Sequence, residues 1–167
     1  MRAANTFWIV VAIGVMVVAE TLDVLPPTLA THFDGSGAPN GWSSRAEYVI
    51  FLAGIGIGLP LLIVGVVGVF ARRAAQWINL PHREIWLAET HRAEGMARVR
   101  EHIWWLACVL AMTALNTHLA LLGAHKHHPP QLPLGAALGL IAFPVACMVI
   151  WAVTWHRLFR PPPGSHR

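Results

Sequence analysis

The chain has 167 residues, of which 56% are hydrophobic and only 12% are charged, and its formal net charge is +4. Soluble domains usually carry about 25% charged residues, so this composition argues against a soluble domain and indicates a small polytopic membrane protein. The positive charge lies next to apolar runs, so we assign it to contact with a membrane surface and expect no nucleic-acid binding.

Four apolar runs each reach the roughly 20 residues that are needed to cross a hydrocarbon core about 30 Å thick. They cover residues 7–25, 48–70, 103–123 and 134–155. Because no water is present there to bond the backbone, such runs must be helices. The first run has an alternative interpretation as a signal peptide cleaved before Glu20. We expect it to stay in the protein, because its apolar stretch continues past that residue.

The first and second runs are joined by an outer loop, residues 26–47, with the sequence "PPTLATHFDGSGAPNGWSSRAE". Its Pro-Pro pair stiffens the exit from the first helix. The segments "DGSG" and "NG" are turn signals, since glycine and asparagine tolerate positive φ. We therefore predict a structured extracytoplasmic loop that folds back over the membrane surface, and not a flexible linker.

The second and third runs are joined by an inner segment, residues 71–102. Pro81 ends any helix that enters from the second run. From about Glu84 the composition favours a helix, in which Ile85, Trp86 and Leu87 would enter the membrane interface. We predict a cytoplasmic amphipathic helix that leads into the third membrane helix.

Glycine pairs at a spacing of four residues occur in two of the runs, each followed by a proline. The residues are Gly54, Gly58 and Pro60 in the second run, and Gly135, Gly139 and Pro144 in the fourth. Small residues at this spacing allow helix backbones to approach closely, so we expect close crossings at these glycines. The prolines should kink their helices or open a local gap in the backbone hydrogen bonds.

Lysine and arginine residues predict the orientation, because they are enriched in cytoplasmic segments. Ten of them lie at the two termini or in the segment 71–102, whereas only Arg45 and Lys126 lie on the other side. We therefore expect both termini in the cytoplasm, with the lipid bilayer as the first partner of the chain. The expected fold is a single all-α membrane domain over residues 1–167, with four transmembrane helices.

Two motifs resemble a known family. The outer-loop sequence "LPPTLATHFDGSGAPNGWSSRAEY" and the inner sequence "INLPHREIWLAETHR" at residues 78–92 are similar to the bacterial membrane domain of unknown function 1648. That domain forms the N-terminal part of the SdpI-type immunity proteins. The resemblance implies a location in the inner membrane of a bacterial cell, and immunity to, or sensing of, an external peptide or toxin. Two alternatives remain open, namely a small accessory or structural subunit of a larger membrane complex and a small transporter.

The candidate functional residues fall into three groups. Contacts to an external ligand or partner are expected from the outer-loop residues His32, Phe33, Asp34, Asn40 and Trp42. Polar side chains at membrane depth are costly and often functional, and those of interest are Glu20, Asn116 and His118. The inner motif offers either a docking surface for a partner or a helix cap and interface anchor, through Asn79, Pro81, His82, Arg83, Glu84 and Trp86.

Within the second group, a pair between Glu20 and His118 is possible, since both residues lie near the outer ends of their helices. It would act as a proton relay, a substrate contact or a simple hydrogen-bonded clasp. In the other outer loop, His125, His127 and His128 could join His32 and Asp34 around Zn²⁺ or Cu²⁺. Their spacing matches no standard metal site, so we expect no metal and no cofactor. No catalytic motif stands out, and we expect no enzyme.

The charge asymmetry makes a prediction about topology. Reporter domains fused after Arg73 and after Arg160 should report a cytoplasmic position, and those inserted at Ser36 and His127 an external one. Paired cytoplasmic and periplasmic reporters in a bacterial host measure this. A cytoplasmic signal at Ser36 would contradict the orientation.

Overall fold

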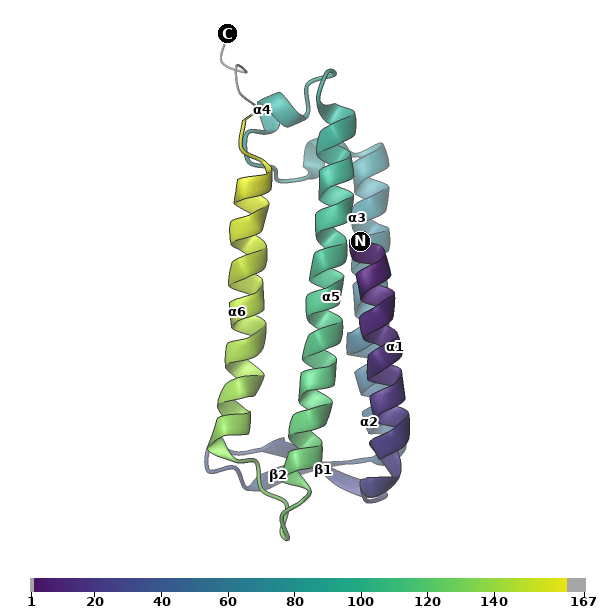
Figure 1. Ribbon diagram of the computed structural model, residues 1–167, viewed down its shortest axis with the longest axis vertical. Coiled ribbons are helices and arrows are strands. Elements are labelled where there is room, and N and C mark those ends of the chain that lie inside the picture. Colours follow the sequence, from purple (N-terminus) through teal and green to yellow (C-terminus); the bar gives the residue numbers. More distant parts are fainter. Residues whose placement is uncertain (1, 162–167) are drawn as a thin grey trace.

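The computed structural model describes residues 2–161, and four long helices run side by side through it (Figure 1). Three are continuous, namely α1 (Ala3–Thr21), α5 (Arg92–Ala124) and α6 (Leu134–Leu158). The second long helix consists of α2 (Arg45–Ala53), the π-helical turn η2 (Gly54–Gly58) and α3 (Leu59–Arg73). All four are long and apolar enough to span a membrane. Their length and composition indicate a multi-pass membrane protein.

The π-helical turn comes directly before Pro60, which lies in the first turn of α3. Proline has no N–H to donate to the preceding turn, and its ring needs room there. A wider π turn provides that room, and such turns commonly interrupt α-helices in this way. The gap in backbone hydrogen bonds expected around this proline is therefore present as η2. In the fourth long helix, Pro144 lies within α6.

The expectation of an all-α protein is wrong in the loop after α1. The 3₁₀ turn η1 (Leu22–Val24) is followed by an antiparallel hairpin of β1 (Thr28–Phe33) and β2 (Pro39–Ser44). The register pairs Thr28 with Ser44, and it shifts between Ala30 and Phe33. The turn residues "DGSG" close the hairpin, so the backbone of this loop satisfies its own hydrogen bonds. This loop therefore contains two β-strands.

The central helix of the structure is α5, which contacts α1, η2, α3 and α6 (Figure 1). Three buried clusters lie along it. At the hairpin end the buried residues are Leu25, Leu29, Tyr48, Leu52, Ala114 and Leu121. In the middle they are Phe7, Ala107, Cys108 and Ala111. At the opposite end, called the α4 end below, they are Ala71, Ala75, Leu80, Trp86, Met96, Val99 and Phe159.

The amphipathic helix predicted from about Glu84 within residues 71–102 is present only in part. The segment holds a 3₁₀ turn η3 (Ala75–Trp77) and the one-turn helix α4 (Arg83–Trp86), and residues 92–102 already belong to α5. Trp86 is only 1% exposed, and its Nε1–H donates to the carbonyl of Phe159 at 2.9 Å. Because this indole lies in the core, the segment cannot lie as a helix with Trp86 in the membrane interface. The third long helix consequently begins at Arg92 and not near Ile103.

The helix α6 is the peripheral one, and none of its residues is buried. A reciprocal contact ties it to α5. The Nε2–H of His102 donates to the carbonyl of Trp151 at 3.0 Å, and the Nε1–H of Trp151 donates to the carbonyl of His102 at 3.1 Å. Their rings stack with centroids 4.8 Å apart. Nearer the hairpin end, Asn116 Nδ2 donates to the Gly139 carbonyl over a longer 3.5 Å.

The close helix crossings expected at the glycine pairs are absent at those residues. A Cβ added at Gly54, Gly135 or Gly139 would meet nothing within 4 Å, and one at Gly58 would meet only a carbonyl at 3.9 Å. The glycine that faces a neighbouring helix is Gly56, where an added Cβ would come within 3.0 Å of the Ala114 Cβ. Spacing alone favoured the wrong residues, because it does not specify which face of the helix meets α5.

The different surroundings of Gly56 and Gly139 predict the behaviour of two matched variants. Gly56→Leu should lower the free energy of unfolding by about 1–3 kcal/mol, because the new side chain overpacks the contact between η2 and α5. Gly139→Leu should cause no such loss, since open space surrounds that position. Thermal unfolding in the same detergent measures both. Equal losses in the two variants would show that Gly56 does not lie at a close crossing.

Candidate functional site

The hairpin is held in place from several sides. At its end Ser44 forms a capping box with Glu47 at the start of α2. The N–H of Ala30 donates to Nε2 of His125 at 3.1 Å, and the Nδ1–H of His125 donates to the Leu121 carbonyl at 2.9 Å. Both nitrogens of this imidazole are therefore engaged in structural hydrogen bonds. The loop between α5 and α6 and the hairpin thus form one fixed unit.

A second attachment lies at the tip of the hairpin. The N–H of Leu132 donates to the carbonyl of Gly37 at 3.0 Å. Gly37 has a φ of +83°, and a Cβ at this position would collide with the Leu132 carbonyl oxygen. Glycine is needed here for both the positive φ and the close approach. The tip is therefore fixed against the segment that leads into α6.

Asp34 organises the turn itself. Its Oδ1 accepts hydrogen bonds from the Ser36 N–H at 2.8 Å, from the Ser36 hydroxyl at 2.6 Å and from the Ala38 N–H at 3.1 Å. These bonds, that from the Ser36 hydroxyl first, hold the pKa of the exposed carboxyl below its ordinary value of 3.8. Asp34 is consequently a negative charge fixed in position at neutral pH.

The other candidate contact residues of the outer loop lie on the same hairpin. Trp42 is 53% exposed on β2. Asn40 and His32 are also exposed, and the His32 side chain packs over Gly41, where an added Cβ would come within 2.9 Å of it. Phe33 is half-buried at the end of β1. The hairpin therefore brings an indole, a carboxylate, an amide and an imidazole onto one small ordered element.

A buried polar cluster lies beneath the hairpin, at the junction of three helices. His118 of α5 is 0% exposed. Its Nε2 lies 2.7 Å from Thr21 Oγ1 of α1, and its Nδ1 lies 2.8 Å from the Tyr48 hydroxyl of α2. The Thr21 hydroxyl donates to the Val17 carbonyl at 2.5 Å, so it accepts from Nε2–H of the histidine. Tyr48 in turn donates to Nδ1, which makes a one-directional chain of hydrogen bonds.

The partner of His118 is thus not Glu20, whose side chain is exposed on α1. The pair expected from the two helix ends is wrong because Glu20 lies on another face of α1, one residue before Thr21. Sequence reasoning missed Thr21 and Tyr48. Tyr48 carried a signal, since it is the only tyrosine of the chain and sits at the start of an apolar run. Asn116 contacts α6 and takes no part in this cluster.

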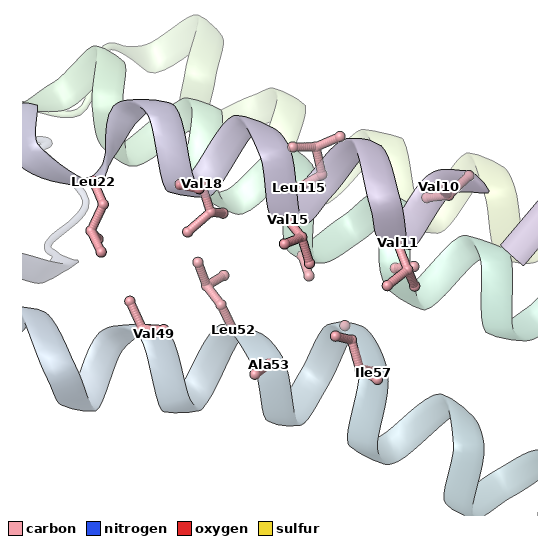
Figure 2. Close-up of a pocket in the computed structure, with 15 residues that line it drawn as sticks. Val10, Val11, Val15, Val18, Leu22, Val49, Leu52, Ala53, Ile57 and Leu115 are labelled. Carbon is pink, nitrogen blue, oxygen red and sulfur yellow. The ribbon is translucent and has the colours of Figure 1, made fainter. Parts of the chain in front are cut away.

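An apolar groove adjoins the polar cluster and runs between α1 and α2, with α5 as its floor (Figure 2). Its volume is about 310 Å³, and every lining residue is a valine, leucine, isoleucine, alanine or glycine. Leu22 and Val49 line the end of the groove, and each is the chain neighbour of a residue in the polar cluster. Figure 2 shows Val15 and Val18 of α1 and Leu22 of η1 pointing across the groove toward α2.

The inner motif is largely structural. Trp86 lies in the core beneath Arg98, whose guanidinium carbon is 4.4 Å from the centre of the indole ring. His82 adopts a φ of +51° where α4 begins, and Arg83 donates to the Gln76 carbonyl at 3.0 Å. Asn79, His82, Arg83 and Glu84 are exposed, and Pro81 is half-buried. Within residues 2–161 no group of three or more His, Cys, Asp or Glu side chains is arranged to hold a metal ion.

The polar cluster makes a prediction about stability. Tyr48→Phe should lower the free energy of unfolding by about 1–3 kcal/mol, because it leaves Nδ1 of a buried histidine without a donor. Thr117→Val is the control, since that hydroxyl bonds the Thr113 carbonyl of its own helix at 2.9 Å. Thermal unfolding of the purified variants measures the effect. Equal melting temperatures for Tyr48→Phe and the wild type would contradict the assigned network.

Comparison with known proteins finds one match, in the N-terminal part of the chain. The family model described as a domain of unknown function, DUF1648, matches residues 8–57. No curated protein and no solved structure matches the chain. The matched segment contains most of α1, the whole hairpin, α2 and most of η2, and therefore Thr21 and Tyr48 as well as the outer-loop motif. The match confirms the resemblance of the outer-loop motif to this family, whereas the inner motif at residues 78–92 lies outside the matched segment.

Proposed function

We propose that the hairpin end recognises a peptide or toxin outside the cell, as part of an immunity or sensing function. The observation that carries this proposal is the half-exposed Trp42 on a hairpin that is fixed at its tip, at its base and along β1. A binding surface that is already ordered loses little conformational entropy when its ligand binds. Tryptophan is also among the residues that contribute most to binding energy at interfaces.

The chemistry of the hairpin suggests what kind of peptide would bind. Trp42 offers an apolar surface, and Asp34 offers a carboxylate whose Oδ1 is saturated by its own turn. A ligand with apolar and basic groups would complement both. Because the pKa of Asp34 is lowered, its carboxylate stays charged at every pH above its ordinary value of 3.8. Recognition of a basic group should therefore persist into mildly acidic medium.

Two substitutions test recognition separately from folding. Trp42→Ala removes the exposed indole. Asp34→Asn keeps an oxygen for the turn hydrogen bonds but removes the charge. Cells that lack the protein, and cells that carry the wild type or either variant, are challenged with secreted peptide fractions from the same bacterium. We expect deletion of the protein and the Trp42→Ala substitution each to raise the sensitivity of the cells to these fractions about ten-fold or more, because an interface tryptophan contributes that much to binding.

The control is Trp77→Ala, which removes a tryptophan that is 76% exposed at the α4 end. It should leave protection unchanged, and all variants should have wild-type protein levels and melting temperatures. Equal survival of the deletion strain and the wild type would contradict an immunity role. The alternative of an accessory subunit would then be favoured, since α6 has no buried residue and could pack on a larger membrane complex.

A further inference from the structure

We propose that the apolar groove between α1 and α2 binds one anionic phospholipid, with an acyl chain in the groove and its phosphate at Arg45. The groove contains no polar side chain, so its occupant must be a hydrocarbon. The lining residues of α1 and η1 run from Val10 to Leu22, which is about 18 Å at 1.5 Å per residue. This length is close to half of a hydrocarbon core about 30 Å thick, which is the depth that one acyl chain covers.

The width of the groove distinguishes an acyl chain from a helix. A volume of 310 Å³ spread over about 18 Å corresponds to a cross-section of about 17 Å². This volume is the space open to the centre of a water molecule, and on the same measure a helix about 10 Å across needs roughly 40 Å². A transmembrane helix of a partner or of a second copy therefore does not fit into the groove, whereas a single hydrocarbon chain does.

A charged residue lies at the hairpin end of the groove, where the phosphate of such a lipid would be. Arg45 lies one helical turn before the lining residue Val49, and its Nη1 is 3.3 Å from Oδ1 of Asp23, which follows the lining residue Leu22. The Asp23 side chain is 96% exposed, so a phosphate can replace it. Nη2 of Arg45 bonds the Leu25 carbonyl and holds the guanidinium in place. Arginine is well suited to phosphate because its planar fork of donors matches the phosphate oxygens.

Two glycines provide a matched test. Gly14 lines the groove, and Gly65 lies on α3 away from it, and a Cβ added at either would meet nothing within 4 Å. Gly14→Leu should therefore fill the groove without a clash. Gly65→Leu should gain the same helix propensity but leave the groove unfilled. Ala53→Leu fills the groove from the opposite wall. Melting temperatures close to that of the wild type establish that each variant is folded.

The proteins are taken from nanodiscs of equal phosphatidylglycerol and phosphatidylcholine, and native mass spectrometry counts the lipids that each retains. We expect one phosphatidylglycerol on the wild type and on Gly65→Leu, and at least ten-fold less on Gly14→Leu and Ala53→Leu. Arg45→Gln should retain the two lipids equally. Unchanged retention in both groove-filling variants, or no preference for phosphatidylglycerol in the wild type, would overturn the proposal. Because the hairpin residues are unaltered, these results are independent of peptide recognition.

Discussion

The arrangement of the hairpin end depends on one buried imidazole. His118 lies in apolar surroundings on α5, where an unpaired ring nitrogen would cost about 1–3 kcal/mol. Both nitrogens must therefore be bonded, and the partners come from two other helices, Thr21 of α1 and Tyr48 of α2. This requirement fixes the rotation of α1 and α2 about their axes relative to α5. Within the bilayer, these hydrogen bonds orient the helices relative to one another. Apolar contacts alone do not, since lipid tails are as apolar as the helices.

The fixed rotation has two consequences for the surface of the molecule. It places the ends of α1 and α2 so that β1 and β2 can bridge them, with Arg45 N–H donating to the Pro27 carbonyl at 2.9 Å where the hairpin meets α2. It also leaves α1 and α2 on either side of α5 with an apolar groove between them. The ordered hairpin and the groove are thus outcomes of the same helix orientation, and both lie mostly within residues 8–57, the segment that the DUF1648 model matches.

The α4 end is held together by different contacts, which involve aromatic rings and carbonyl groups. Trp86 and Arg98 both donate to carbonyls at the end of α6, namely those of Phe159 and Leu158. The close approach of Trp86 to α5 requires a glycine at position 95, because a Cβ added at Gly95 would come within 2.9 Å of the Trp86 carbonyl. These bonds satisfy C-terminal carbonyls of α6 that have no partner within the helix. They also connect α6, which has no buried residue of its own, to the remainder of the structure.

The sequence by itself determined the four long helices, because apolar runs of about 20 residues have no other stable form in lipid. It also determined the turn at "DGSG" and the resemblance of residues 8–57 to DUF1648, since both depend on local residue identities. Only the tertiary structure decided that Trp86 is a core residue, that Gly56 and not Gly58 meets α5, and that His118 bonds Thr21 and Tyr48. These contacts join residues far apart in the chain and depend on how each helix is rotated. Composition and spacing do not specify that rotation, because every face of such helices is nearly equally apolar.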